Sequence, residues 1–99
     1  MKVLVDGNVV ADSEDARFLD KYYYFPKKDI NMELLLESNH RTECPWKGIA
    51  SYFHVQVNGK IFENIAWSYP ECKVEAKIIE GYIAFWDPAI VFKKFYVVN

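Results

Sequence analysis

The clearest alternation of hydrophobic and polar positions along the chain lies in Ser51–Val57. A period of two places successive side chains on opposite faces, which is typical of a half-buried β-strand. Asn58 and Gly59, which follow, favour a two-residue hairpin turn, and Lys60–Tyr69 has the composition of a returning strand. The pattern therefore predicts a β-hairpin here.

Other segments that favour strands are short and bounded by turn residues. They are Lys2–Val5, Val9–Asp12, Arg17–Tyr24, Tyr82–Trp86 and Ile90–Val98. Pro26–Ile30 predicts a helical turn or tight loop, and Glu71–Glu80 has apolar residues at helical spacing ahead of Gly81. Strands and helices do not alternate, so nothing indicates a parallel sheet. We expect one compact, mainly antiparallel β domain over residues 1–99, with about seven strands and one or two short helical turns.

One stretch, Ser38–Gly48, has no periodic apolar pattern and predicts an irregular loop. It nevertheless contains a histidine, a cysteine, a tryptophan and a lysine. Binding and catalytic groups concentrate on loops that a rigid scaffold holds in place. Candidate functional residues are therefore sought first in this segment.

Composition excludes several classes of protein. The chain has 99 residues, of which 52% are hydrophobic and 26% charged, so it is not a disordered chain. A net charge of −2 disfavours nucleic acid as a partner, because phosphate neutralisation needs a clustered basic surface. No apolar run reaches the roughly 18–20 residues of a membrane span, so we expect no membrane partner. The two cysteines are too few for a disulfide scaffold, which favours a cytoplasmic location.

Several short motifs follow one another through the chain. They are Tyr24-Phe25-Pro26, Cys44-Pro45-Trp46-Lys47-Gly48, Ala66-Trp67, Tyr69-Pro70 and Gly81-Tyr82-Ile83-Ala84-Phe85. In order and spacing they resemble the Domain of Unknown Function 427 family, over nearly the whole chain. The resemblance implies a small domain of the β-tent type, found chiefly in bacteria and some fungi. It implies no established activity.

Two kinds of chemistry associated with such domains find little support in these residues. The family is sometimes labelled nucleotidyltransferase-like, but the chain has no glycine-rich phosphate loop and no close pair of metal-binding carboxylates. Zinc-bearing β-tent relatives use two CxxC pairs, whereas Cys44 and Cys72 each stand without such a partner. We therefore expect no metal and no other cofactor.

Cys44 is the candidate nucleophile or redox thiol. Proline favours the first position of a helix, so Pro45 would place Cys44 where a helical turn begins. The backbone dipoles there, and Lys47 one turn on, would favour the thiolate. His40 would then act as base and Glu33 as the residue that orients it. The alternative is that Cys44 is a small buried residue of the core.

Glu33 lies in a short apolar segment, Glu33–Glu37, whose period is unclear. If it faces inwards, its carboxylate needs a partner, and Lys47 is the natural one. If it lies on a strand edge, it faces solvent.

Aromatic residues make up 17% of the chain, and we expect most of these rings to build the core of so small a domain. Trp46 and Trp67 lie in the most specific motifs, and three further rings lie beside prolines or in the same motifs. We predict that they line a small-molecule pocket, with polar groups orienting the ligand. The predicted ligand-binding residues are Trp46, Trp67, Lys47, Tyr24, Phe25, Thr42 and Tyr69.

Three functions thus remain open from the sequence. The chain binds a small organic or nucleotide-like ligand, or it is an enzyme that uses Cys44, or it is a structural or protein-interaction module whose aromatic residues are all core. The β-rich segment Val91–Val98 would also allow an edge strand to pair with a second copy, as a homodimer.

Overall fold

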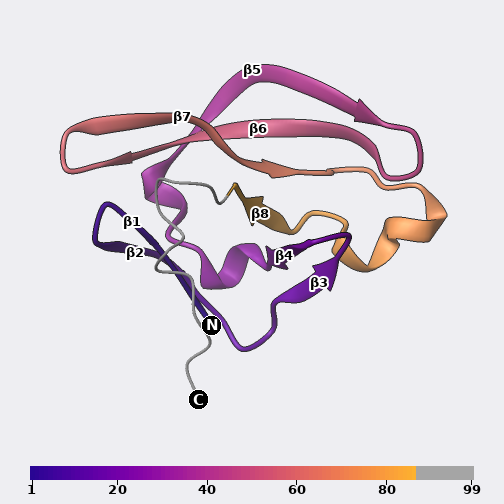
Figure 1. Cartoon of the computed structure of the whole chain (residues 1–99), viewed down its shortest axis with the longest axis horizontal. Coiled ribbons are helices and arrows are strands. Elements are labelled where there is room, and N and C mark those ends of the chain that lie inside the picture. Colours follow the sequence, from indigo (N-terminus) through magenta and orange to yellow (C-terminus); the bar gives the residue numbers. More distant parts are fainter. Residues whose placement is uncertain (87–99) are drawn as a thin grey trace.

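The strands of this chain form two antiparallel sheets in the computed structural model, which describes residues 1–86 (Figure 1). The smaller sheet is the hairpin of β1 (Lys2–Val5) and β2 (Asn8–Asp12). The larger sheet contains β3 (Arg17–Leu19), β4 (Tyr22–Phe25), β5 (Leu35–Cys44), β6 (Gly48–Val57), β7 (Lys60–Ser68) and β8 (Ile83–Phe85). Three short 3-10 helices are η1 (Lys27–Asp29), η2 (Met32–Leu34) and η3 (Val74–Ile79). The expected mainly β, antiparallel fold is confirmed.

The strand order of the larger sheet is β3-β4-β8-β7-β6-β5. Strands β5, β6 and β7 follow one another as hairpins, and the chain then returns through residues 69–82 to place β8 between β7 and β4. Ala84 of β8 pairs with Trp67 on one side and with Tyr24 on the other. Two motifs far apart in the sequence are thereby joined across one strand.

The two faces of the larger sheet carry different clusters of buried residues. Alternation along the strands separates them, so that Tyr24 and Phe25, or Trp67 and Ala66, belong to opposite clusters. The hairpin-covered core packs beneath β1 and β2 and consists of Val3, Val5, Val10, Ala11, Phe25, Ile30, Val55, Val57, Ile65, Ala66, Ile83 and Phe85. The aromatic face consists of Tyr24, Ala50, Trp67, Tyr69, Cys72, Ala76, Ile79 and Ala84. Figure 1 shows the β1–β2 hairpin and residues 70–82 on opposite sides of the molecule.

The prediction of an irregular loop over Ser38–Gly48 is wrong. Residues 38–44 belong to β5, and only Pro45–Lys47 form a turn before β6 begins. Among the described strands, β5 lies at the edge of the sheet and pairs with β6 alone. Both of its faces are largely exposed, so its sequence needs no alternating hydrophobic residues. The irregular composition reflects an edge strand, not a loop.

Two other predicted elements differ in detail. The single predicted run Arg17–Tyr24 is a hairpin, because Asp20 and Lys21 adopt positive φ angles of 51° and 82° and turn the chain. The helical spacing in Glu71–Glu80 corresponds to the 3-10 helix η3. The predicted strand Ile90–Val98, and the Val91–Val98 edge considered for a homodimer, lie outside the described residues.

Gly48 fixes the position of the returning segment. Its φ is 126°, and a β-carbon there would lie 2.8 Å from the carbonyl oxygen of Glu71. Gly48 bridges to Cys72, and the Lys73 amide donates to the Lys47 carbonyl at 3.0 Å. Only glycine allows this close approach, because any side chain would clash with Glu71. This explains why the CPWKG motif ends in a glycine.

Candidate functional site

Aromatic rings from three strands meet on the aromatic face. Trp67 of β7 lies next to Tyr22 of β4, with ring centroids 4.8 Å apart and planes at 88°. Tyr52 of β6 lies on its other side, with a centroid distance of 6.1 Å. Edge-to-face and tilted contacts of this kind are favourable for aromatic pairs. The three rings form one continuous aromatic wall.

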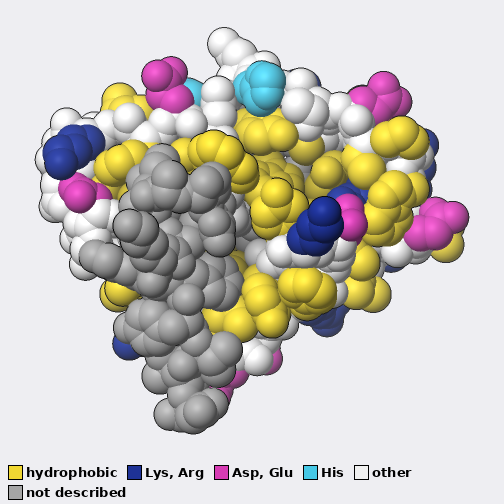
Figure 2. Space-filling view, viewed as in Figure 1, with side chains coloured by type: hydrophobic (Ala, Val, Ile, Leu, Met, Phe, Trp, Pro, Cys, Tyr) yellow, Lys and Arg dark blue, Asp and Glu magenta, His cyan; other side chains and the backbone are white. Residues whose placement is uncertain are grey.

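An open cavity of about 520 Å³, which we call the aromatic hollow, lies over this wall. It is lined by Tyr22, Tyr24, Lys47, Tyr52, Glu63, Asn64, Trp67, Tyr69 and Trp86. Figure 2 shows hydrophobic side chains gathered on this side of the molecule, between the β6–β7 and β3–β4 hairpins. A concave aromatic surface with few polar groups is the usual form of a small-molecule site.

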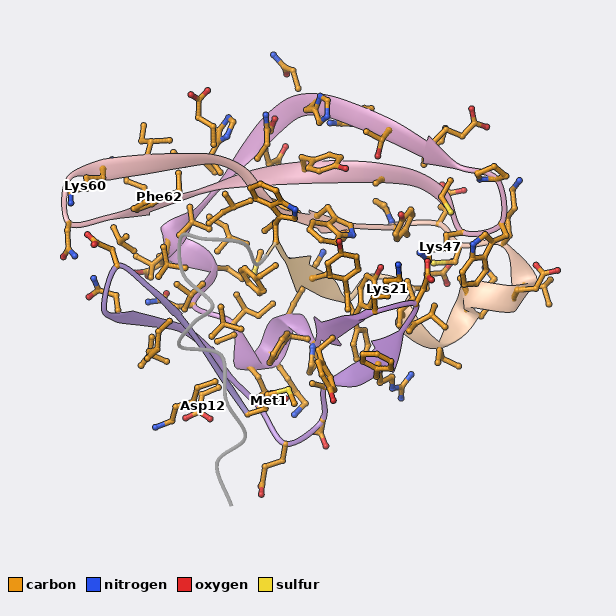
Figure 3. The ribbon with its side chains drawn as sticks, in the orientation of Figure 1. Met1, Asp12, Lys21, Lys47, Lys60 and Phe62 are labelled. Atoms are coloured by element: carbon orange, nitrogen blue, oxygen red, sulfur yellow. The ribbon has the colours of Figure 1, made fainter. Side chains whose placement is uncertain are left out.

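Lys47 supplies a buried cation at one end of the hollow. Its side chain is 6% exposed, and its ammonium lies 2.6 Å from Oδ2 of Asp20, which is 47% exposed. This hydrogen bond from Lys47 holds the pKa of the Asp20 carboxyl below its ordinary value. Figure 3 shows Lys47 beside Lys21, where the β5–β6 turn approaches the β3–β4 turn. Two turns distant in sequence are thus joined by an ion pair.

Two aromatic rings enclose the Lys47 ammonium. The nitrogen lies 4.8 Å from the centroid of Trp46 and 5.9 Å from that of Tyr69. Such cation–π contacts are attractive and help to hold the side chain in place. Trp46 itself is 38% exposed and does not line the hollow.

The hydroxyl of Tyr24 is buried and has no hydrogen-bond partner in the part of the chain that the structure describes. Burial raises the pKa of Tyr24 to about 12. The neighbouring Trp67 indole opposes this rise, but it makes no hydrogen bond of normal geometry with the hydroxyl. Burial also raises the pKa of Tyr69. Both phenols are therefore neutral at physiological pH.

Four predicted ligand-binding residues, Tyr24, Lys47, Trp67 and Tyr69, lie together in the lining of the hollow. The other three lie outside it. Phe25 packs against Phe85 in the hairpin-covered core, because neighbouring residues of a strand point to opposite faces.

Thr42 and Trp46 lie just outside the lining, next to residues that form it. Thr42 is exposed, and its hydroxyl lies 3.0 Å from the Tyr52 hydroxyl. Trp46 covers Lys47 from the solvent side. These two residues therefore contact lining side chains and would affect a ligand through them.

No hydrogen bond joins Cys44, His40 and Glu33 within residues 1–86, and the three occupy different settings. Cys44 ends β5 and is followed by a turn, so the expected helix start is absent. His40 lies four residues earlier in the same strand, about 13 Å away at about 3.3 Å per residue. Its ring packs on Tyr52, with centroids 4.6 Å apart.

The expectation that Glu33 faces inwards beside Lys47 is also wrong. Glu33 is exposed on η2, and the carboxylate beside Lys47 belongs to Asp20. The apolar neighbours of Glu33 follow a tight 3-10 turn and not a strand, so neither face of that turn buries it. Cys44 packs beside the aromatic face but is only half-buried, whereas the core alternative expected a buried residue.

Several residues of the site carry little or no signal in the sequence. Tyr22 and Tyr24 share a face because they are two apart in β4, so strand alternation could have found Tyr22. For Asp20 and Asn64 the sequence signal is weaker. Both adopt positive φ angles, and Asp and Asn are the non-glycine residues that tolerate such angles best, so their presence is only a hint of a turn or an irregular position. Glu63 had no sequence signal at all.

Within residues 1–86, no group of three or more His, Cys, Asp and Glu side chains is arranged to hold a metal ion. In the same part of the chain, no helix combines the length and the apolar surface needed to cross a bilayer.

Residues 1–95 match the model of a family described as a domain of unknown function, DUF427. Because the match covers nearly all of the 99 residues, the chain belongs to this family, as the resemblance of its motifs indicated. A search of curated proteins found no match to the chain.

Proposed function

We propose that this DUF427 domain binds a small organic molecule with a planar ring in the aromatic hollow. The observation that carries the proposal is the hollow itself, about 520 Å³ with six aromatic rings in its lining. Small-molecule sites have volumes of roughly 300–1,000 Å³, apolar or aromatic walls and a few polar anchors. Rings stacked in a core leave no such space.

The charges of the hollow favour an uncharged ring over a phosphate-bearing one. Lys47 is the only basic residue in the described lining, and the Asp20 carboxylate already compensates its charge. Glu63, also in the lining, adds a negative charge. Phosphate recognition needs several cations or backbone amides aimed at the oxygens. A nucleotide is therefore the less favoured form of the ligand.

The orphaned Tyr24 hydroxyl gives a second line of support. Burying a hydroxyl without a partner costs free energy, and native proteins retain few such groups. Tyr24 lines the hollow, so the cost is incurred beside the site and not in the hairpin-covered core. Retention of an unfavourable group there fits a binding role better than a structural one.

A thiol-based reaction has weaker support than binding. The thiol of Cys44 lacks the helix start, the base and the orienting carboxylate that the sequence suggested. No specific contact of Cys44 favours a catalytic role.

The test compares two neighbouring tyrosines of β4. Tyr22 lines the hollow, whereas Tyr23 packs on Phe18 outside it, with centroids 4.8 Å apart. The probes are benzamide, nicotinamide and benzoate, and the readouts are the shift in melting temperature and the emission of Trp67. In a background of Trp46→Phe and Trp86→Phe, Trp67 is the only one of the three tryptophans that remains.

We expect at least one probe to bind, with Tyr22→Leu weakening its affinity about fivefold or more and Tyr23→Leu leaving it unchanged within about twofold. Equal affinities in the two variants, or no binding of any probe by the parent protein, would overturn the proposal. The variants are first compared by urea unfolding, so that a folding defect is not mistaken for lost binding.

A further inference from the structure

Asn64 stands at an irregular position of β7, where the pairing with β6 shifts register between Phe53 and Val55. Its φ is 54°, in the left-handed region that asparagine tolerates. The Asn64 backbone N–H donates to Nδ1 of His54 at 3.0 Å. Its backbone is therefore fixed by the fold itself, before any ligand arrives.

The Asn64 side chain is fixed separately, by a buried serine. The Ser38 hydroxyl donates to Oδ1 of Asn64 at 2.5 Å, and its oxygen accepts the His40 backbone N–H at 3.0 Å. Ser38 is 7% exposed, so water competes little for this contact. This contact directs the amide oxygen toward Ser38, so the NH2 group is the part of the amide that points away from it.

That NH2 group has no hydrogen-bond partner among residues 1–86. Asn64 lines the aromatic hollow together with Glu63, Trp67 and Trp86. The amide thus supplies a fixed donor beside two indole rings. Its counterpart on a ligand must be an acceptor, because two donors cannot pair.

The charge of the hollow restricts which chemical groups of a ligand can serve as this acceptor. A carboxylate bound at the Asn64 amide would share the hollow with the Glu63 carboxylate, because both residues line it. Like charges at short distance are unfavourable where water is partly excluded. A carbonyl oxygen or an aromatic ring nitrogen avoids this repulsion and keeps the hydrogen bond.

The geometry points to Asn64 as the specificity-determining residue of the hollow, with its amide donating to a carbonyl oxygen or ring nitrogen of an uncharged planar ligand. Ser38 is a positioning residue, which acts by holding the amide oxygen. This inference rests on the proposed function and adds the chemistry by which the ligand is recognised.

The experiment uses Asn64→Asp in the whole chain. Aspartate tolerates a positive φ and can still accept from Ser38, but it replaces the NH2 donor with an acceptor oxygen. The two probes share one ring: benzamide carries an uncharged carbonyl acceptor, and benzylamine carries a cationic donor. Dissociation constants are measured through Trp67 emission in the same single-tryptophan background.

We expect the ratio of the benzamide to the benzylamine dissociation constant to rise about tenfold or more in Asn64→Asp, because benzamide loses its donor and benzylamine gains an acceptor. Asn64→Gly keeps the backbone conformation without a side chain, and should weaken benzamide without strengthening benzylamine. If Asn64→Asp does not fold, Asn64→Gly serves as the test variant in its place. Ser38→Ala should weaken benzamide less than either, because it only releases the amide.

Two failures are distinguishable. If both probes bind with the dependence on Tyr22 described above but their ratio is unchanged in Asn64→Asp and Asn64→Gly, the inference about Asn64 is wrong and the binding function stands. If neither probe distinguishes Tyr22→Leu from Tyr23→Leu, the proposed function fails, and the inference fails with it.

Discussion

The two faces of the six-stranded sheet are built from alternate residues of the same strands, but one is a closed core and the other borders an open hollow. The hairpin-covered core is mostly aliphatic, and the β1–β2 hairpin lies over it. The aromatic face is covered at one end by Cys72, Ala76 and Ile79, and elsewhere its rings border an open hollow. One face therefore provides stability. The other keeps large rings, the half-buried Lys47–Asp20 ion pair and a hydroxyl without a partner among residues 1–86 in a partly open space. The difference shows how a domain of 99 residues can combine a core with a site.

The largest expected effect comes from the closed face. Phe25 is fully buried against Phe85, so Phe25→Ala leaves a cavity that the surroundings cannot fill. We expect a loss of about 3–5 kcal/mol in the free energy of unfolding, measured by equilibrium urea denaturation. The matched variant is Tyr22→Leu on the aromatic face, which should cost only about 1 kcal/mol because its ring already borders open space. Similar losses in the two variants would contradict the division into a closed and an open face.

A smaller effect of opposite sign is expected for Tyr24. Tyr24→Phe removes a buried hydroxyl that has no partner among residues 1–86, so the free energy of unfolding should stay unchanged or rise by about 1 kcal/mol. The same variant should remove one phenol that titrates near pH 12 in an ultraviolet absorbance titration. A loss of about 1 kcal/mol instead would mean that the hydroxyl does have a partner, with the Trp67 indole the first candidate.

The smallest effect concerns the pH dependence of the Lys47–Asp20 pair. The pKa of Asp20 is lowered in the folded protein, so the pair contributes fully above the ordinary value of 3.8 and is lost as the pH falls through the lowered one. Asp20→Asn should therefore be less stable than the parent at neutral pH, with the difference shrinking below about pH 4. The measurement is the urea unfolding midpoint of the parent and of Asp20→Asn at several pH values between neutral and acidic.

The exposed Lys28–Asp15 pair provides the control for that measurement. Its nitrogen–oxygen distance is 2.8 Å, but both side chains are more than half exposed. Solvent screens such a pair, so Asp15→Asn should change stability less than Asp20→Asn at neutral pH. The opposite order would show that burial of Lys47 adds nothing to its ion pair.

The sequence predicted most of the fold and part of the site. The β6–β7 hairpin followed from alternation and from Asn58-Gly59, and both strands are present. β6 begins earlier than predicted, at Gly48, and β7 ends one residue earlier, at Ser68. β5 was mistaken for a loop, since an edge strand exposed on both faces has no alternation to detect. Tyr24, Lys47, Trp67 and Tyr69 were assigned to one pocket on their motifs alone, and they share the lining.

The rest of the site could not be predicted from the sequence, because the residues that contact one another there are far apart in the chain. Lys47 was matched with Glu33, yet its partner is Asp20, which a hairpin turn brings to it. The position of Asn64 is fixed by hydrogen bonds to Ser38 and His54, which lie on two other strands.

By itself the sequence determined the antiparallel β class, the turns and the family, because periodicity and turn chemistry are local properties of the chain. Only the tertiary structure decided which rings share a hollow, which carboxylate meets Lys47 and which group of Asn64 remains free. Those outcomes depend on strand order, since β8 inserts between β7 and β4 and sets the distances between segments that no local pattern relates.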